Sequence, residues 1–396
     1  MRIVLVSANA GTSMGGEAIK AYQYFKYLLD KGLDVLLFTH ERCRMELLET
    51  CKLPRDRIHF VADSLLQNLL WRSRVFARHV DTVFHLEVAR ACRGFDPAQT
   101  LIHYLCPISP TVRRHPPKGY EYVVGPLSGN LFFPPAFKDR AGRREVVEEF
   151  VYRPAMNMSG VLSGDLRRAA RVLNSGYQRT RDALDWAGCK PDRILDVVDS
   201  GIDDALQAAP RIEHEGVNRN FIYWGRLIDL KGVDLAIRAL LLCEESTTLT
   251  VYGTGPALDG LKHLAQSLGL ERRVRFGGWI SHEELVTEMR RYRGFVFPTL
   301  CESNGISMQE AMMQGLPTVA LRWGGPMGIA NENEAVFVDP SSEQSVIDGL
   351  AGAMMRLGSE PKYAESISTA ARKRAQAQFG WDTVAQSWMA AYEGVL

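Results

Sequence analysis

Two glutamates stand eight positions apart in the stretch ESNGISMQE, residues 302–310. Glu302 falls in a loop after the apolar run GFVFP, whereas Glu310 falls just inside an expected helix. A carboxylate can accept hydrogen bonds from sugar hydroxyls. Gly305 would let a ligand approach the backbone closely, and the amides of a helix start suit an anion or a hydroxyl. The stretch therefore predicts a polar ligand site.

Both glutamates also have an ordinary structural interpretation. Ser307 and Glu310 have the Ser-x-x-Glu spacing of a capping box, in which the glutamate bonds to the amide of the capping residue. Glu302 could be a solvated loop acid. Spacing alone leaves these alternatives open, although neither explains the Asn304-Gly305 pair.

A second charged motif is GRLIDLKG, residues 225–232. Arg226 and Lys231 follow an expected strand, and an arginine fork and a lysine ammonium both bind phosphate oxygens. The pair is suited to a pyrophosphate. The alternative is two ordinary surface cations.

Gly15 and Gly16 follow the first expected strand and could let a phosphate or an acceptor sugar approach a helix start. The alternative is a flexible loop. The segment does not have the GxGxxG pattern, so a dinucleotide-dependent oxidoreductase is disfavoured.

Short apolar runs alternate with helical patterns along the chain and should position these loops. Strands are expected at residues 3–6, 34–38, 58–61, 100–103, 122–124 and 170–173, and again in FIYWGRL, TTLTVYG, RVRFGG, GFVFP and PTVALR. A helix is expected over residues 18–31, ending at Gly32. The alternation predicts two α/β domains with parallel sheets, joined near residues 188–215. Ligands bind at the carboxyl ends of such strands.

Bulk properties exclude several classes of protein. The 396 residues are 46% hydrophobic and 23% charged, which is typical of a globular chain. The net charge of +1 gives no drive toward nucleic acid. The seven cysteines include no CxxC pair, so a disulfide framework or zinc site is not expected, and a reducing cytoplasm fits. No signal peptide or membrane span is expected.

The stretch from residue 297 to 320, together with GRLIDLKG, resembles the retaining nucleotide-sugar-dependent glycosyltransferases of family four. VVDSGID, GTGPALDGL and FGGWISHEEL resemble later segments of that family, and LIHYLCPISP with VVGPLSGNLFFPP resembles a bacterial exopolysaccharide-assembly subgroup. The resemblance implies the α/β GT-B fold, with two Rossmann-like domains facing across a cleft. The domains would be 1–195 for the acceptor and 196–378 for the nucleotide sugar, and residues 379–396 would pack back on the first.

The resemblance also implies roles for individual residues. Arg226 and Lys231 would hold the donor diphosphate, Glu302 the hexose and Glu310 the ribose. The amides of Asn304, Gly305 and Ile306 would lie near sugar and phosphate, Gly15 and Gly16 near diphosphate or acceptor, and Gly253 and Trp279 near the base. Family members commonly have an aromatic residue at the position of Asn304, which leaves the donor sugar undefined. His103 would face the sugar, although a lone histidine is more often structural.

Chemistry in this family is usually described as front-face substitution, in which the leaving phosphate oxygen takes the proton of the acceptor hydroxyl. The two cations would replace a metal, so neither a metal nor a cofactor is expected. The expected reaction is transfer of a hexosyl unit from a UDP- or GDP-linked sugar to a glycan or lipid-linked acceptor. The rival hypotheses are a sugar-nucleotide epimerase of the same fold, which needs no acceptor, and a non-catalytic nucleotide-sugar-binding subunit.

Residues 65–80 combine leucines, Trp71 and Phe76 with three arginines. Between residues 40 and 120 there are 13 Lys plus Arg against 8 Asp plus Glu, a balance of +5. A basic amphipathic helix can lie on an anionic bilayer, which would suit a lipid-linked acceptor and a peripheral place at the inner face of the membrane. A packed domain helix with a solvated basic face is the alternative.

Overall fold

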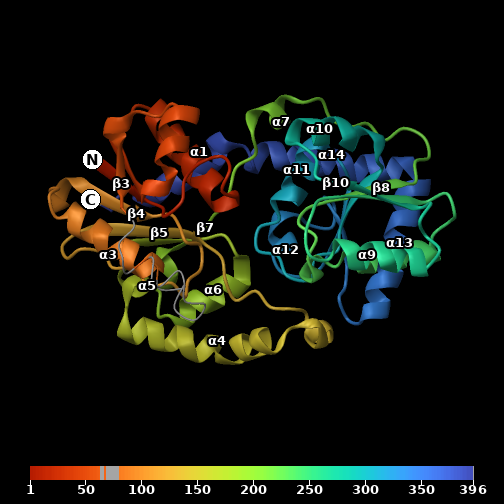
Figure 1. Ribbon diagram of the computed structural model, residues 1–396, viewed down its shortest axis with the longest axis horizontal. Helices are drawn as coiled ribbons and strands as arrows, with labels where there is room; N and C mark the ends of the chain where they lie inside the picture. The colour runs from red at the N-terminus through yellow and green to blue at the C-terminus, as the bar shows by residue number, and fades with distance from the viewer. Residues whose placement is uncertain (63–66, 68–79, 396) are drawn as a thin grey trace. The chain divides into compact units, whose positions relative to one another are not determined.

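The computed structural model describes residues 1–62, 67 and 80–395, which divide into two compact units (Figure 1). Unit 1 comprises Met1–Asn130, Phe150–Gly201 and Asp382–Leu396. Unit 2 comprises Leu131–Glu149 and Ile202–Trp381.

Unit 1 is built on a seven-stranded parallel sheet with the order β3-β2-β1-β4-β5-β6-β7. Its strands are β1 (Arg2–Val6), β2 (Val35–His40), β3 (Ile58–Val61), β4 (Thr100–Tyr104), β5 (Glu121–Leu127), β6 (Arg171–Asn174) and β7 (Ile194–Asp196). All five residues of the central strand β4 are buried, as expected of a strand that is covered on both faces. The predicted strands of this half are confirmed, apart from small differences at their ends.

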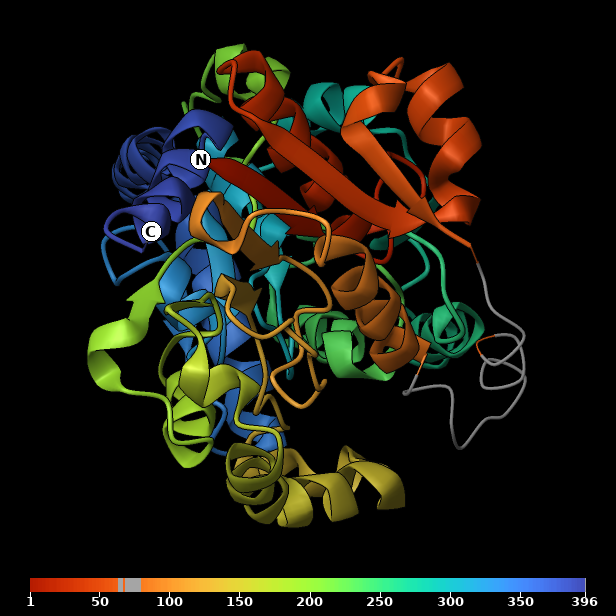
Figure 2. The same cartoon turned by 90° about the vertical axis from the view of Figure 1, so that its left-hand side faces the viewer.

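The helices of unit 1 complete its core and tie the end of the chain to its beginning. They are α1 (Gly16–Asp30), α3 (Val80–Cys92), α5 (Asp165–Arg168), α6 (Tyr177–Trp186) and α15 (Trp381–Met389), while α4 (Arg143–Leu162) begins in one unit and ends in the other. Trp388 of α15 is fully buried and donates its indole N–H to the Val198 carbonyl over 2.9 Å. The two ends of the chain lie side by side in this unit (Figures 1 and 2).

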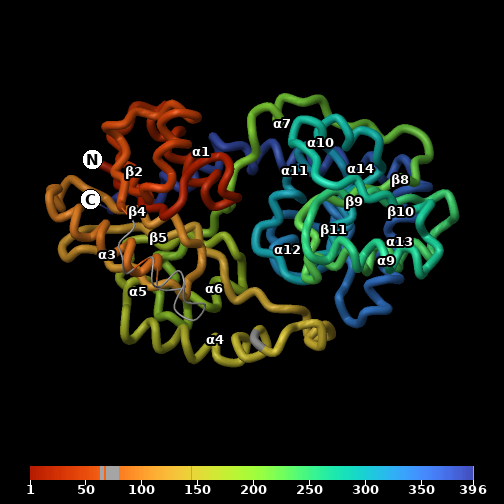
Figure 3. Tube along the Cα trace, viewed as in Figure 1, coloured from red at the N-terminus to blue at the C-terminus, as the bar shows by residue number. Residues whose placement is uncertain are grey.

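Unit 2 is built on a six-stranded parallel sheet with the order β10-β9-β8-β11-β12-β13. Its strands are β8 (Asn220–Trp224), β9 (Thr248–Tyr252), β10 (Val274–Gly278), β11 (Gly294–Phe297), β12 (Thr318–Leu321) and β13 (Val336–Val338). Its helices are α7 (Asp204–Ala208), α8 (Val233–Ala239), α9 (Leu258–Ser267), α10 (His282–Glu288), α11 (Ile306–Gln314), α12 (Pro326–Ile329), α13 (Glu343–Ser359) and α14 (Pro361–Gln378). Helices α8, α9 and α13 pack together on one side of the sheet, and α11 packs with α14 on the other (Figures 1 and 3).

Both sheets are doubly wound, so each unit is Rossmann-like and the predicted α/β class is confirmed. In each sheet the direction of strand addition reverses once, between β1 and β4 in unit 1 and between β8 and β11 in unit 2. Loops at the carboxyl ends of the strands on either side of such a reversal diverge and leave room for a ligand. The motifs singled out in the sequence follow β1, β8 and β11.

The observed units differ from the predicted domains mainly at residues 131–149, which were expected in the first domain but group with unit 2. Residues 196–201, expected in the second domain, group with unit 1, and residues 379–381, expected to pack on the first domain, group with unit 2. The position of residues 131–149 has a physical cause, because Trp323 donates its indole N–H to the Phe132 carbonyl over 2.9 Å and Arg140 forms ion pairs with Asp234 and Glu343. The main change of unit occurs between Gly201 and Ile202.

The predicted membrane-contact segment, residues 65–80, lies almost wholly outside the described residues. Within the described part of the chain, no helix is both long and apolar enough to cross a bilayer.

Candidate functional site

Lys231 and Glu302 meet where the strand order of unit 2 reverses. Lys231 lies in the loop after β8 and Glu302 in the loop after β11. The Lys231 ammonium is 2.5 Å from a Glu302 carboxylate oxygen, and the two side chains are 19% and 15% exposed. Gly232 has φ 63°, and a Cβ there would lie 2.2 Å from the Pro298 carbonyl oxygen, so the two loops are packed backbone to backbone. The lysine and the glutamate therefore neutralise each other at this position.

A hollow of about 650 Å³ opens beside this pair, at the carboxyl ends of β8, β9 and β10. Its lining brings together five of the predicted residues, namely Arg226, Gly253, Trp279, Ile306 and Glu310. Arg226 is exposed, and Trp279 is 74% exposed and therefore presents its ring to a ligand. Gly253 has φ 131°, and a Cβ there would lie 1.9 Å from the Gly225 carbonyl oxygen. The lining of the hollow thus combines glycine backbone at Gly253, a cation at Arg226 and an aromatic ring at Trp279.

Glu310 is held as a hydrogen-bond acceptor inside this hollow, and not as a helix cap. The indole N–H of Trp224 donates to one carboxylate oxygen over 3.1 Å, and Nε2 of His282 lies 3.3 Å from the other. The capping-box alternative is wrong, because the residue that precedes α11 is Gly305 in the left-handed region, and no side chain caps the helix. Glu310 is therefore oriented toward the lining of the hollow by two side chains.

Trp224 and His282 were not predicted from the sequence. Trp224 ends the apolar run FIYW and reads as a core residue, while His282 follows the Ser281 that caps α10. Their positions could have identified them as site residues. Trp224 ends β8 and His282 begins α10, at the edge of the sheet where ligands bind.

The hydrogen bond from His282 to Glu310 gives this site a pH dependence. That bond raises the pKa of His282 above its usual 6.5; burial lowers it, and the charges of Glu310 and Asp203 raise it further. A group whose pKa is raised by folding stabilises the folded state below its unfolded pKa, and this contribution is lost as the pH rises through the folded pKa. We expect the melting temperature of the wild type to exceed that of His282→Gln at about pH 6, and the difference to shrink by about pH 9. A difference independent of pH would contradict the ion pair.

Asn304 and Gly305 lie in the loop between Glu302 and α11. Asn304 is 7% exposed, and its side-chain oxygen accepts a hydrogen bond from Gln309 over 2.8 Å. Its side chain is therefore part of the loop's internal packing, which leaves the backbone amides of residues 304–306 as the groups available to a ligand. The amides of the first helical turn have no carbonyl partner within the helix.

Gly15 and Gly16 lie in unit 1 at the start of α1, where an added Cβ would meet no atom within 4 Å. The loop before them is held by one carboxylate. Glu46 accepts hydrogen bonds from the Thr12 amide and hydroxyl over 2.6 and 2.8 Å, and from the Ser13 amide and hydroxyl over 2.8 and 2.9 Å. These four bonds fix a loop whose glycines face open space.

Removing the Glu46 carboxylate should therefore loosen the glycine loop. In Glu46→Ala, we expect the Thr12 and Ser13 amides to exchange with solvent about tenfold faster or more, because charge-assisted hydrogen bonds are lost. Hydrogen–deuterium exchange measures this directly. Glu49→Ala is the control, since Glu49 lies on the same short helical segment and is exposed. Equal exchange in the two variants would rule out the clamp.

His103 does not face a ligand. Its ring is fully buried in β4, with Nε2 2.6 Å from the Gly125 carbonyl oxygen and Nδ1 2.7 Å from the Tyr392 hydroxyl. Burial lowers the pKa of His103 to about 4, against a smaller opposing effect of the bond to Gly125. The expectation of a sugar-facing histidine is corrected: both ring nitrogens are occupied inside the core of unit 1, and His103 is neutral at physiological pH.

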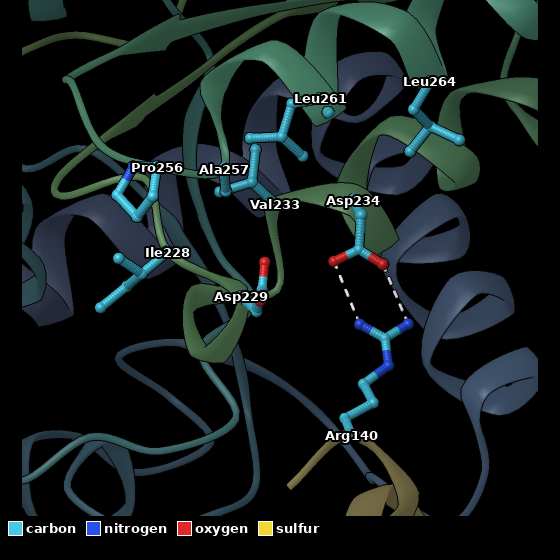
Figure 4. Close-up of a pocket in the computed structure, with 10 residues that line it drawn as sticks. Arg140, Ile228, Asp229, Val233, Asp234, Pro256, Ala257, Leu261 and Leu264 are labelled. Atoms are coloured by element: carbon cyan, nitrogen blue, oxygen red, sulfur yellow. Dashed lines mark hydrogen bonds and ion pairs between the residues drawn. The ribbon is translucent and has the colours of Figure 1, made fainter. Parts of the chain in front are cut away.

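The described residues contain no group of three or more His, Cys, Asp or Glu side chains arranged to hold a metal ion. A second hollow, of about 510 Å³, lies on the other side of Pro256 and is lined by α8, α9 and Arg140 (Figure 4). Its walls are mainly apolar, and Arg140 and Asp234 face each other at its edge (Figure 4).

A family model matches the part of the chain that carries this geometry. Residues 202–374, which contain the paired charges and the 650 Å³ hollow, match the model described as "Glycosyl transferases group 1". The matched residues all lie within unit 2.

Curated relatives match only part of the length of this chain. A glycogen synthase of Mycobacterium tuberculosis is 31% identical over 254 residues, which is 60% of this chain and 61% of the relative. A GDP-mannose-dependent phosphatidylinositol monomannoside mannosyltransferase of the same species is 27% identical over 53% of this chain and 58% of the relative. The chain thus spans about three fifths of the length of these relatives.

The structural match extends over the whole chain. Anabaena HepE, solved with UDP and glucose, aligns with a TM-score of 0.66 over 99% of both chains at 17% identity. This likeness shows the shared GT-B fold.

Proposed function

We propose that this protein is a retaining glycosyltransferase. It transfers a hexosyl unit from a UDP- or GDP-linked sugar to a glycan or lipid-linked acceptor in bacterial polysaccharide assembly. The observation that carries the proposal is the arrangement in unit 2, where Arg226, Trp279 and Glu310 line one hollow and the Lys231–Glu302 pair lies at the reversal of strand order. Relatives named for nucleotide-sugar transfer and a structural neighbour solved with UDP and glucose support it.

Each group has a role that its chemistry permits. Arg226 and Lys231 bind the diphosphate and stabilise the charge that develops as the glycosidic bond breaks. Glu310, preoriented by Trp224 and His282, accepts hydrogen bonds from the ribose hydroxyls. The ring of Trp279 packs beside the base. Glu302, released from Lys231 by the incoming diphosphate, accepts hydrogen bonds from the hexose.

The reaction step itself is a front-face substitution. The acceptor oxygen forms a bond to the anomeric carbon on the side from which the diphosphate leaves, and the leaving phosphate oxygen takes the acceptor's proton. The protein contributes position and charge stabilisation and needs no nucleophile of its own. Because two side-chain cations face the diphosphate, the proposal requires neither a metal nor a cofactor.

A thermal-shift panel tests the donor site. UDP, GDP, ADP and their common sugar conjugates are compared, each with and without EDTA. A ligand at about a hundred times its dissociation constant stabilises the folded state by about 2.7 kcal/mol. A selective shift with one nucleotide, insensitive to EDTA, supports the proposal. The absence of a shift with every nucleotide contradicts the donor site, and donor conversion without an acceptor would identify an epimerase.

We also propose that the protein binds peripherally to the inner face of the cytoplasmic membrane, where a lipid-linked acceptor would be found. Residues 65–80 carry the basic and apolar side chains that would contact anionic lipid. Co-sedimentation with vesicles that contain anionic lipid is the test, and binding that persists after the arginines of this segment are replaced by glutamine would refute it.

A further inference from the structure

Residues 131–140 form a segment that we call the strap. It follows residues of unit 1 in the chain, yet it groups with unit 2, as do residues 141–149 after it. At its first end, the Phe132 carbonyl accepts the Trp323 indole N–H over 2.9 Å, and the Leu131 carbonyl accepts the Cys301 thiol over 3.4 Å. This end is therefore bonded to the two loops that follow β11 and β12.

The other end of the strap is anchored by Arg140, the last residue of the short helix Pro135–Arg140. Its guanidinium forms a two-point pair with Asp234, with N–O distances of 3.1 and 2.9 Å (Figure 4). It also lies 2.8 Å from a Glu343 carboxylate oxygen. Arg140 and Asp234 are each 24% exposed. A fork-to-carboxylate pair fixes orientation as well as distance.

The two anchors adjoin the two charged residues of the proposed donor site. Asp234 is in the first turn of α8, three positions after Lys231. Cys301 directly precedes Glu302, and Trp323 precedes a turn in which the Gly325 amide donates to the Glu302 carbonyl over 2.9 Å. The strap thus connects the element that carries Lys231 to the loop that carries Glu302.

We propose that the strap positions the donor site, and that Arg140 is a positioning residue that sets the separation of Lys231 and Glu302. The inference rests on the proposed function. In the proposed function these side chains bind a diphosphate and a hexose, and displacements of about 1 Å at such groups lower rates strongly. Arg140 contacts no substrate in this scheme and acts through α8.

The test compares Arg140→Ala with Lys138→Ala. Lys138 is also on the strap, but its ion-pair partner is Glu149 on α4, over 3.2 Å, and not a residue of α8, so it is the matched control. We expect kcat/KM for the nucleotide sugar to fall about tenfold in Arg140→Ala and to stay at the wild-type value in Lys138→Ala. Arg140→Lys, which keeps the charge but loses the fork, should give an intermediate loss.

A double-mutant cycle shows whether the effect passes through α8. If Arg140 acts through Asp234, the losses of Arg140→Ala and Asp234→Ala do not add in the double variant. Additive losses would overturn the inference, and so would a lowered melting temperature with unchanged kcat and KM, since that is the result of a purely structural pair.

Trp323→Phe tests the other anchor and covers the case in which Arg140→Ala fails to fold. It keeps an aromatic ring and removes the donor to the Phe132 carbonyl, so kcat/KM should again fall while the nucleotide still binds. Wild-type kinetics in this variant would count against the strap. A wild-type protein that shows no transfer with any nucleotide sugar is a different result, because it refutes the proposed function itself.

Discussion

Replacing Lys231 by alanine should lower sugar transfer by about 10²–10³-fold or more, with the fold intact. Lys231 is the cation at the reversal of strand order in unit 2, and it is paired with Glu302 over 2.5 Å. Groups that stabilise charge on the leaving diphosphate act most strongly in the transition state, and removal of one such group typically costs this much. The loss should appear in kcat as well as in KM, measured by release of the nucleoside diphosphate.

Lys262→Ala is the matched control for Lys231. Lys262 is an exposed lysine on α9 of the same unit, outside the lining of the hollow. Circular dichroism should be close to wild type in both variants, whereas the melting temperature should fall in Lys231→Ala alone, because that change leaves the Glu302 carboxylate, which is 15% exposed, without its ion-pair partner. Normal turnover in Lys231→Ala would show that the donor has been placed in the wrong part of the molecule.

Replacing Glu310 by alanine should raise KM for the nucleotide sugar about 10- to 100-fold and change kcat much less. Loss of one charge-assisted hydrogen bond from a ribose hydroxyl to the carboxylate costs about 1.5–3 kcal/mol, which corresponds to about this change in KM. The ribose is remote from the bond that breaks, so these contacts bind ground state and transition state alike. The nucleoside diphosphate alone should lose affinity by the same factor.

Glu283→Ala serves as the comparison for Glu310→Ala, because Glu283 is an exposed acid on the first turn of α10 that does not line the hollow. An equal effect of the two variants would mean that Glu310 acts only through general charge. A fall in kcat with KM unchanged would indicate that Glu310 contacts the reacting sugar and not the ribose.

The sequence was most informative where a local pattern had a single physical meaning. Buried parallel strands such as residues 3–6 are continuous apolar runs, and they were located to within a few residues. The charged motifs that follow β8 and β11 could be placed at ligand-binding loops because parallel strands present their carboxyl ends on one edge. Strand β7 was missed, since its three residues include only one that is buried.

Tertiary partners explain what the sequence could not show. The spacing of Ser307 and Glu310 satisfies a capping box, but Trp224 and His282 compete for the same carboxylate from 86 and 28 positions away. His103 has the position of a ligand-facing residue, yet its partner Tyr392 comes from the far end of the chain. The strap has no local signature, because its attachment to unit 2 depends on Trp323, Asp234 and Glu343.

The last residues of the chain have a consequence for biosynthesis. Tyr392 is hydrogen-bonded to both Tyr24 and His103 in the interior of unit 1, and Trp388 packs edge-on against Tyr24. During translation, the core of unit 1 stays incomplete from the time Gly201 is made until Tyr392 is made. For these 191 residues at about 5–20 residues per second, that interval is roughly 10–40 s. All segments of unit 2 are made within this interval, so the N-terminal part of unit 1 waits for residues that follow the whole of unit 2.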